Sequence, residues 1–201
     1  MPVTEHPDYW AVRGWANTVK KLHLTVDAAF FGNSITCGSS FEEYFAADSL
    51  NIINLGYPGD NIQGMLNRID MLVNVHPKKV FVMAGINGLK EQTLDEFRKE
   101  YGILITAIKD SLPDAKIYLE SILPVNTEMR LGKNTADNKK IIEANKLIGV
   151  IARERHCAYV DLHRLYVKNG EMPEALTRDG VHLKPECYDR WAKAIHKYLL
   201  E

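Results

Sequence analysis

The stretch AAFFGNSITCGSS, residues 28–40, changes character in its middle. Its first residues belong to a nearly unbroken apolar run over 26–31, which is typical of a strand buried on both faces. Gly32, Asn33 and Ser34 follow at once, and small polar residues of this kind favour a tight turn at the start of a helix. The stretch therefore predicts a buried strand that leads through a turn into a helix and carries Ser34 at the junction.

Four more short apolar runs have the character of buried strands. Together with the first, the predicted strands are 26–31, 51–55, 79–84, 116–121 and 158–161. Longer segments with apolar residues at helical spacing separate them. This alternation predicts an α/β fold, a three-layer α/β/α sandwich around a five-stranded parallel sheet. We expect the strand order 2-1-3-4-5, a common order for open sheets of this kind.

Helices are expected at five places along the chain. They are 9–22, 61–72, 93–112, 141–152 and a last helix that begins near Pro185. Thr93 and Glu96 form a capping-box pattern, and proline is favoured at a first helical position. No shift in composition divides the chain, so we expect one domain over residues 1–201, with 1–24 as a helical lead-in packed on the same domain.

The net charge and the cysteines indicate which kinds of binding partner to expect. Lys and Arg total 25 against 26 Asp and Glu, and the net charge of −1 gives no electrostatic basis for binding nucleic acid or a membrane surface. Cys37, Cys157 and Cys187 lack C-x-x-C spacing, which argues against a disulfide framework and against a zinc site. The expected partner is a small molecule.

The N-terminal segment shows no basic-then-apolar leader, and no run approaches the roughly 18 apolar residues of a membrane span. We therefore expect a soluble protein, cytoplasmic as the chain stands. Removal of a leader would make a periplasmic or secreted origin equally consistent. The sequence leaves open whether subunits pair into a homo-oligomer.

Loops rich in glycine and polar residues follow the first three strands. Ligands of an open parallel sheet bind beyond the carboxyl ends of the strands, where the strand order reverses, so GNSIT, LGYPGDN and AGINGL should be neighbours. Ser34 supplies a hydroxyl nucleophile and its own N–H. Gly56 lets a second backbone N–H approach a ligand closely, and Asn87 adds a side-chain amide. These groups are the parts of an oxyanion-binding site for acyl transfer.

The stretch LTRDGVHLKP, residues 176–185, offers the base that such a nucleophile needs. Asp179 and His182 are three residues apart, and Gly180 permits a sharp turn between them. This spacing lets the carboxylate reach imidazole Nδ1 and leaves Nε2 for the serine. The sequence therefore predicts Ser34, His182 and Asp179 as a catalytic triad.

Four short motifs, GNSIT, LGYPGDN, AGIN and DGVHL, resemble blocks I, II, III and V of the SGNH/GDSL hydrolase family, in order and across nearly the whole chain. The pattern GDNIQGMLNRI is most similar to the branch containing platelet-activating-factor acetylhydrolase-like proteins and carbohydrate O-acetylesterases. The resemblance implies a flavodoxin-like sandwich, ester cleavage without a metal or organic cofactor, and Ser34 as the nucleophile. It also implies Ser34, Gly56 and Asn87 as oxyanion donors.

Two positions depart from the family pattern. Asn33 stands where the family usually has Asp before the serine, and Gly88 stands where Asp often follows the block III asparagine. Asn33 still donates and accepts hydrogen bonds. We therefore expect the replacement of Asp by Asn to affect the hydrogen bonds that hold the turn more than the role of Ser34 as nucleophile.

These features together predict a serine esterase that removes small acyl groups, with acetyl favoured, from a polar alcohol such as an O-acetylated carbohydrate. The segment 123–138 has no clear periodicity, and its Asn126 and Arg130 suit a hydroxylated substrate. With Asn33, they are the candidate substrate-binding residues. A simply solvated loop explains the segment equally well.

Three alternatives remain open at this point. Ser34 taken alone is well explained as a helix cap. A non-catalytic flavodoxin-like binder of phosphate or flavin would explain the glycine-rich turn, although the segment from Gly32 to Gly38 lacks P-loop spacing and such a binder would not require Asp179 and His182. A lipase or thioesterase for longer acyl chains would use the same set of residues.

Overall fold

A computed structural model of the chain describes residues 7–130 and 135–201. Its strands are β1 (Ala28–Gly32), β2 (Ile52–Gly56), β3 (Lys79–Met83), β4 (Lys116–Glu120) and β5 (Ala158–Val160). All neighbouring strands are parallel, and the order β2-β1-β3-β4-β5 confirms the predicted five-stranded sheet. The first strand ends at Gly32, so the turn that carries Ser34 starts at the carboxyl edge of the sheet.

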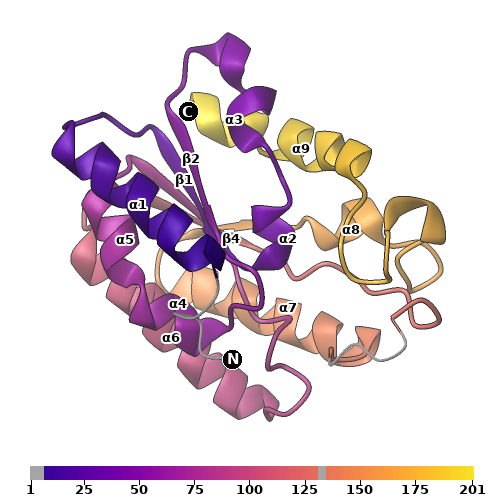
Figure 1. Cartoon of the computed structure of the whole chain (residues 1–201). Coiled ribbons are helices and arrows are strands. Elements are labelled where there is room, and N and C mark those ends of the chain that lie inside the picture. The colour runs from indigo at the N-terminus through magenta and orange to yellow at the C-terminus, as the bar shows by residue number, and fades with distance from the viewer. Residues whose placement is uncertain (1–6, 131–134) are drawn as a thin grey trace.

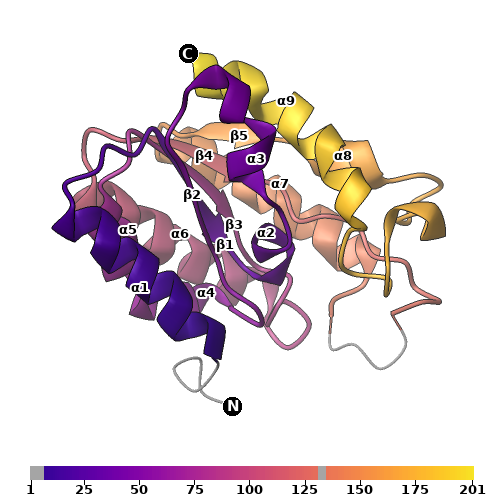
Figure 2. The same ribbon diagram turned by 45° about the horizontal axis from the view of Figure 1, so that its top comes forward.

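Helices cover both faces of the sheet. They are α1 (Pro7–Lys21), α2 (Ser34–Cys37), α3 (Phe41–Tyr44), α4 (Ile62–Asn67), α5 (Ile69–Val75), α6 (Leu94–Ser111), α7 (Asn138–Glu154), α8 (His163–Tyr166) and α9 (Tyr188–Leu200), with 3-10 turns η2 (Ala46–Asp48), η3 (Glu174–Leu176) and η4 (Pro185–Cys187). In Figures 1 and 2, α1, α4, α5, α6 and α7 lie on one side of the sheet, and α3 and α9 lie on the other. The predicted three-layer sandwich is therefore confirmed.

The long helices begin and pack as their sequence patterns predict. Thr93 Oγ1 accepts the N–H of Glu96 at 3.2 Å, and Glu96 Oε2 accepts the N–H of Thr93 at 2.7 Å, which completes the capping box of α6. Asp137 caps α7 by accepting the N–H of Lys140 at 2.8 Å. The stripes that face the sheet are buried: Phe97, Tyr101, Leu104, Ile105 and Ile108 on α6, and Ile141, Ala144, Ile148, Ile151 and Ala152 on α7.

Ends of the predicted helices shift by one to three residues, and two of the helices also differ in how they are built. The helix expected over 61–72 is divided into α4 and α5 at Arg68, because the guanidinium of this residue turns inward to Asp60. The last helix begins at Tyr188, because Pro185 opens the 3-10 turn η4 instead. The break at Arg68 comes from a contact with Asp60 that the local apolar pattern does not contain.

The N-terminal helix packs on the rest of the fold through α5. Arg13 Nη1 donates to Asp70 Oδ2 at 2.6 Å, and Arg13 Nη2 donates to the Tyr9 hydroxyl at 2.7 Å.

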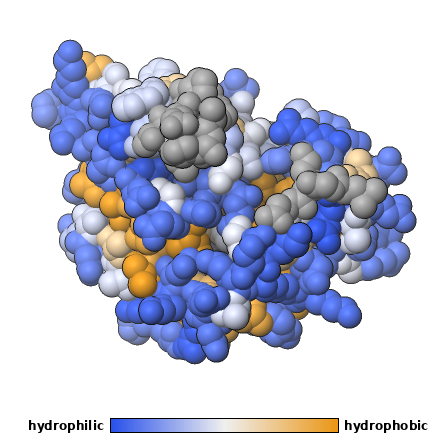
Figure 3. Space-filling view, turned by 60° about the horizontal axis from the view of Figure 1, so that its bottom comes forward, coloured by the Kyte–Doolittle hydropathy of each residue, from blue (hydrophilic) through white to orange (hydrophobic). Residues whose placement is uncertain are grey.

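The face seen in Figure 3 is largely hydrophilic, with smaller apolar areas between the polar ones. None of the helices within 7–130 and 135–201 has the length and apolar character needed to cross a membrane.

A fully buried carboxyl group lies in the core beneath α9. The rings of Phe30, Phe81 and Tyr118 stack across β1, β3 and β4, with centroids 4.9 and 4.6 Å apart. Glu120, at the end of β4, has no exposed surface, and its Oε1 accepts the indole N–H of Trp191 at 2.7 Å. Burial raises the pKa of Glu120 to about 8, although the hydrogen bond from Trp191 acts in the opposite direction.

Glu120 should make the stability of the protein fall as the pH rises. The same carboxyl in the unfolded chain titrates near pH ~4.3, so its proton stabilises the folded state below that pH, and this contribution is lost as the pH rises to about 8. Glu120→Gln, which stays neutral, should remove this loss. Equilibrium urea unfolding measures this effect. The free energy of unfolding of the variant, relative to that of the wild type, should rise between pH 5 and pH 9 by on the order of 4 kcal/mol. A pH-independent difference would contradict the assignment.

Candidate active site

The turn after β1 is held by Asn33 rather than by Ser34. Asn33 has extended backbone angles and accepts the N–H of Ile35 on its Oδ1 at 2.9 Å, which makes it the N-cap of α2. Ser34 is the first helical residue and is half-buried. Asn33 is only 1 % exposed, so the prediction that it contacts a substrate is wrong. The alternative in which Ser34 caps the helix does not hold, because Asn33 is the cap.

Ser34, His182 and Asp179 lie together although the sequence separates the serine from the histidine by 148 positions. Ser34 Oγ is 2.9 Å from His182 Nε2, and His182 Nδ1 is 2.7 Å from Asp179 Oδ2. With its Nδ1 proton directed at the carboxylate, the imidazole presents the Nε2 lone pair to the serine hydroxyl. This arrangement can remove a proton from Ser34 Oγ.

The carboxylate of Asp179 is fixed by its own turn. Its Oδ1 accepts the backbone N–H of His182 at 2.8 Å and that of Val181 at 3.1 Å. Partial burial opposes ionisation, but these hydrogen bonds and the His182 side chain outweigh it and hold the pKa of Asp179 well below its ordinary value. The group is therefore ionised at neutral pH and oriented toward the imidazole.

The turn from 177 to 182 is braced from two sides. Thr177 Oγ1 donates to the carbonyl of His182 at 2.7 Å and accepts the N–H of Gly180 at 2.9 Å. Gly180 has φ +85, and a Cβ on it would lie 2.4 Å from the backbone nitrogen of Arg130. The carbonyl of Gly180 also accepts the N–H of Asn126 at 2.8 Å. The segment 126–130 therefore packs directly against the turn that carries the histidine.

The polar side chains of Asn126 and Arg130 form hydrogen bonds with neighbouring backbone groups. Asn126 Nδ2 donates to the carbonyl of Met172 at 2.9 Å, and its Oδ1 accepts the N–H of Met129 at 2.9 Å. Arg130 Nη1 donates to the carbonyl of Thr135 at 2.9 Å. These contacts give both residues a bracing role, and their contact with a substrate stays a prediction. Residues 131–134 of the same loop lie outside the described residues.

Gly56 is not available as an oxyanion donor, contrary to the prediction. Its N–H donates to Asn54 Oδ1 at 2.8 Å, and a backbone amide has only one hydrogen to donate. The residue is buried, and a Cβ on it would lie 2.3 Å from the backbone nitrogen of Cys37. Glycine is needed at this position because α2 packs directly on the end of β2.

Gly59, in the same loop, has the properties that were expected of Gly56. It is exposed, and its φ of +75 is a conformation that glycine adopts without strain. Within the described part of the chain, its N–H and that of Ser34 donate to no acceptor. The motif LGYPGDN contains two glycines, and they differ in burial, in backbone conformation and in the hydrogen bond that the Gly56 N–H donates to Asn54. All three differences come from the folded structure, so the sequence could not identify Gly59.

Asn87 connects the loop after β3 to the loop after β2. It is half-buried, and its Nδ2 donates to the backbone carbonyl of Asp60 at 2.9 Å. A side-chain amide carries two N–H bonds, so one of them remains for a ligand. Gly85 and Gly88, with φ of +118 and +98, shape the turn that carries the asparagine. A Cβ-bearing Asp at position 88 would be strained in this conformation.

Tyr188 is a further residue near the nucleophile that the sequence patterns did not reveal. Its hydroxyl reaches from the start of α9 and donates to the carbonyl of Ile35 in α2 at 2.6 Å. A Cβ at Gly38 would lie 2.5 Å from the same hydroxyl oxygen. The helix after the His182 turn therefore also holds the helix that begins with Ser34.

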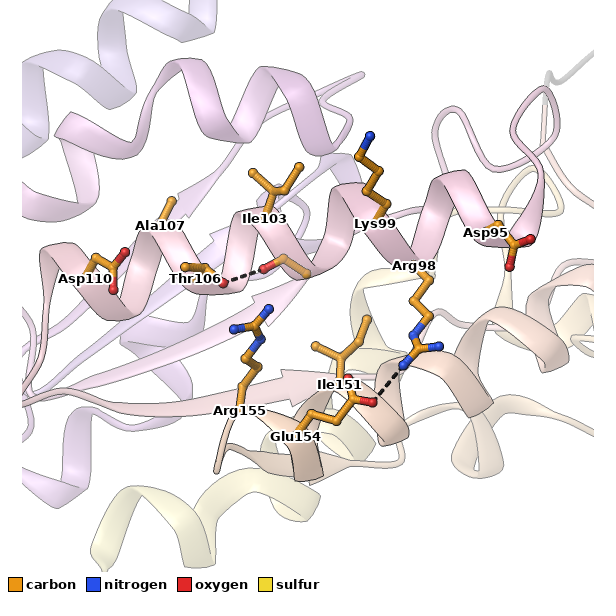
Figure 4. Close-up of a pocket in the computed structure, with 11 residues that line it drawn as sticks. Asp95, Arg98, Lys99, Ile103, Thr106, Ala107, Asp110, Ile151, Glu154 and Arg155 are labelled. Carbon is orange, nitrogen blue, oxygen red and sulfur yellow. Dashed lines mark hydrogen bonds and ion pairs between the residues drawn. The ribbon is translucent and has the colours of Figure 1, made fainter.

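A groove of about 750 Å³ lies elsewhere, between α6 and α7. Figure 4 shows Arg98 of α6 reaching Glu154 of α7, and their side chains pair at 2.7 Å. None of the predicted site residues lines this groove, and it contains no nucleophile with an imidazole partner. Over 7–130 and 135–201, no group of three or more His, Cys, Asp or Glu side chains is placed to hold a metal ion.

Sequence comparison identifies relatives of most of the chain. The sequence model of the GDSL-like lipase/acylhydrolase family matches residues 30–190. An N-acylneuraminate cytidylyltransferase from Streptococcus agalactiae is 25 % identical over 163 residues, which are 79 % of this chain and 35 % of that protein. The chain thus spans about a third of the length of the curated relatives it matches.

Solved structures share the fold. A Streptococcus pneumonia protein, provisionally described as a platelet activating factor, superposes with a TM-score of 0.83 at 23 % identity and covers 94 % of this chain and 91 % of its own. An acetyl xylan esterase superposes with a TM-score of 0.71 at 21 % identity and covers 86 % of this chain and 99 % of its own. At these identities the likeness is one of fold.

Proposed function

The chain belongs to the GDSL-like lipase/acylhydrolase family, and on that premise we propose that it is a serine esterase that removes small acyl groups, acetyl first among them, from a polar alcohol. The observation that carries the proposal is the line of two short contacts from Ser34 Oγ to His182 Nε2 and from His182 Nδ1 to Asp179 Oδ2. A hydroxyl, an imidazole and a carboxylate in this order are the groups that nucleophilic acyl transfer needs.

In the proposed reaction, His182 Nε2 takes the proton of Ser34 Oγ as this oxygen attacks the ester carbonyl. The tetrahedral intermediate collapses when the alcohol leaves with the proton from His182, and an acyl group remains on Ser34. A water molecule then gives a proton to His182 and attacks the acyl-enzyme. Collapse of the second intermediate returns the proton to Ser34 and releases the carboxylic acid.

Three N–H groups would stabilise the oxyanion of both intermediates. The backbone N–H groups of Ser34 and Gly59 and the second N–H of the Asn87 amide have no other acceptor among the described residues. Gly59 replaces Gly56 in this set because of the hydrogen bond between Gly56 and Asn54. Donors of this kind act on charge that develops only during the reaction.

Removal of one oxyanion donor gives a graded test of this set. Asn87→Ala should lower kcat for an aryl acetate by roughly 10²–10³-fold with KM nearly unchanged, because the lost hydrogen bond forms mainly in the transition state. Gln92→Ala, in the helix-entry segment just after this loop, is the control and should change kcat by less than twofold. An effect of Asn87→Ala below threefold would remove Asn87 from the oxyanion site.

The substrate class rests on relatives and on the loop beside the site. One structural neighbour is an acetyl xylan esterase, and a curated relative is named for an acylated sugar acid. The backbone of Asn126 and Arg130 packs against Gly180 in the His182 turn, so this loop would border a hydroxylated alcohol bound at the site. We propose an O-acetylated carbohydrate as substrate. In this proposal the chain acts as one hydrolase domain that includes α1, in keeping with the packing of that helix on α5.

Two measurements test the function together. A fluorophosphonate probe should label the protein at Ser34, because only an activated hydroxyl reacts with it. p-Nitrophenyl acetate should then be hydrolysed faster than p-nitrophenyl decanoate. Labelling with faster turnover of the decanoate would support a lipase or thioesterase instead. Absence of labelling and of turnover on both esters would indicate a non-catalytic binding domain.

A further inference from the structure

An arginine is buried where the first two strands end. Arg68 is 1 % exposed, and its guanidinium donates through Nη2 to the carbonyl of Gly32 at 2.9 Å and through Nη1 to the carbonyl of Leu55 at 2.7 Å. Its Nε donates to Asp60 Oδ2 at 2.7 Å. The guanidinium carbon lies 4.4 Å from the centre of the Phe31 ring, which supports the group from below. Each of its three nitrogens is therefore engaged.

The three acceptors belong to the segments that carry the proposed oxyanion donors. Gly32 precedes the Asn33–Ser34 turn, and Leu55 is the next-to-last residue of β2, the strand that leads into the loop with Gly59. Asp60 follows Gly59 directly, and its backbone carbonyl accepts the Asn87 amide at 2.9 Å. One planar group thus connects the loops after β1 and β2, and through Asp60 it also orients the loop after β3.

The local structure is adapted to this buried pair. Arg68 interrupts what would otherwise be one helix, with φ −122 and ψ 21 between α4 and α5, and so directs its side chain inward. Gly64 leaves room for the carboxylate of Asp60, because a Cβ there would lie 1.9 Å from Asp60 Oδ1. Both features lower local helix stability relative to an unbroken helix with alanine at 64.

A buried ion pair is a weak source of stability, since the loss of hydration offsets much of the attraction. Burial lowers the pKa of Arg68 and raises that of Asp60, in each case against the effect of the partner charge. Well-packed apolar side chains in place of a buried ion pair often give the folded protein equal stability. Apolar side chains cannot donate hydrogen bonds. The planar guanidinium donates to two carbonyls near the strand ends and to one carboxylate, and it fixes the three acceptors in one plane.

We propose that Arg68, acting with Asp60, is a positioning residue that holds Ser34, Gly59 and Asn87 in the arrangement that binds the oxyanion. This inference rests on the proposed function. It assigns to the pair no contact with the substrate and no proton transfer. Misplacement of donors by about 1 Å can cost on the order of 10²-fold in rate, so loss of the pair should act on kcat.

Arg68→Lys tests the proposal, because lysine keeps the charge but has a single donor nitrogen and cannot reach three separate acceptors from one rigid plane. We expect kcat for p-nitrophenyl acetate to fall roughly 10–100-fold, with KM within about threefold. In an Asn87→Ala background the same substitution should cost less, because one of the three donors that it positions is already absent. The matched control is Arg13→Lys at the exposed pair with Asp70, which should leave kcat within twofold.

An activity-independent measurement separates this proposal from the proposed function. In amide NMR spectra, Arg68→Lys should shift the backbone signals of Ser34 and Gly59 and the side-chain NH2 signals of Asn87, whereas Arg13→Lys should not. These shifts are expected even if the wild type hydrolyses no ester, an outcome that would reject the esterase alone. Unchanged signals, or rate effects of Arg68 and Asn87 that multiply, would overturn the positioning role.

A second variant covers the case in which Arg68→Lys does not fold. Asp60→Asn keeps the shape of the side chain and the backbone carbonyl that orients Asn87, and it replaces the charged carboxylate by a neutral amide. It should lower kcat and shift the same NMR signals in the same direction, to a smaller extent. A wild-type spectrum and a wild-type kcat for Asp60→Asn would overturn the proposal.

Discussion

Ser34→Ala is expected to reduce hydrolysis of p-nitrophenyl acetate by roughly 10⁴-fold or more and to abolish labelling by a fluorophosphonate probe. The proposed reaction begins with attack by Ser34 Oγ, and no other hydroxyl lies against the imidazole of His182 among the hydrogen bonds of the described residues. Removal of the nucleophile leaves only catalysis by the oxyanion donors and by substrate binding. Such residual catalysis is small.

The folded state should tolerate this substitution. Ser34 is half-buried, and within 7–130 and 135–201 its hydroxyl forms a hydrogen bond with His182 alone. The helix that it begins is capped by Asn33. The thermal midpoint of Ser34→Ala should therefore lie within about 2 °C of the wild type, since exposed or partly exposed substitutions of this kind change stability little. Ser40→Ala, at an exposed serine that makes no capping hydrogen bond, is the matched control. Turnover retained in Ser34→Ala would reject the triad.

The fold could be predicted because its elements have direct local signatures. A strand buried on both faces is a continuous apolar run, and a helix on a sheet has one apolar stripe. Thr93 and Glu96 even predict the first turn of α6 correctly, because the capping box involves only neighbouring residues. The break at Arg68 was not predictable in the same way, since it depends on acceptors that come from β1 and β2.

In the candidate site, too, contacts between sequence neighbours could be predicted, whereas contacts that form only in the folded chain could not. Asp179 and His182 meet through a three-residue turn, and the rule that ligands bind beyond the carboxyl ends of strands brings Ser34 to them. The choice of Gly56 was wrong because the side chain of Asn54 occupies its N–H. Spacing along the chain shows where a glycine stands but not which of its hydrogen bonds are already made.

Glu120 and Asp60 illustrate a further limit of sequence reasoning. Both carboxyl groups are buried, and neither is marked by its neighbours in sequence: Glu120 ends a strand that otherwise reads as core, and Asp60 lies in a turn. Their environments come from Trp191 and Arg68, which are 71 and 8 positions away. The energetic consequences of such groups can be worked out only after the fold is known.

Asp179→Asn is expected to lower kcat for an aryl acetate by about 10⁴-fold, although the turn around it should persist. The Oδ1 of asparagine can still accept the N–H groups of Val181 and His182, which hold this turn. The group that faces His182 Nδ1 then becomes an NH2 donor. The imidazole will place its proton on Nε2 and offer Nδ1 as acceptor, so no lone pair remains for the proton of Ser34.

The pH dependence separates this effect from simple loss of charge. The pKa of Asp179 lies well below its ordinary value, so the carboxylate stays ionised throughout the neutral range and contributes stability that is lost only as the pH falls into the acid range. Loss of activity in Asp179→Asn should therefore be nearly constant from pH 6 to pH 9. Asp189→Asn, at the exposed pair with Lys193, is the control and should be fully active. More than a tenth of wild-type kcat in Asp179→Asn would mean that another group orients His182.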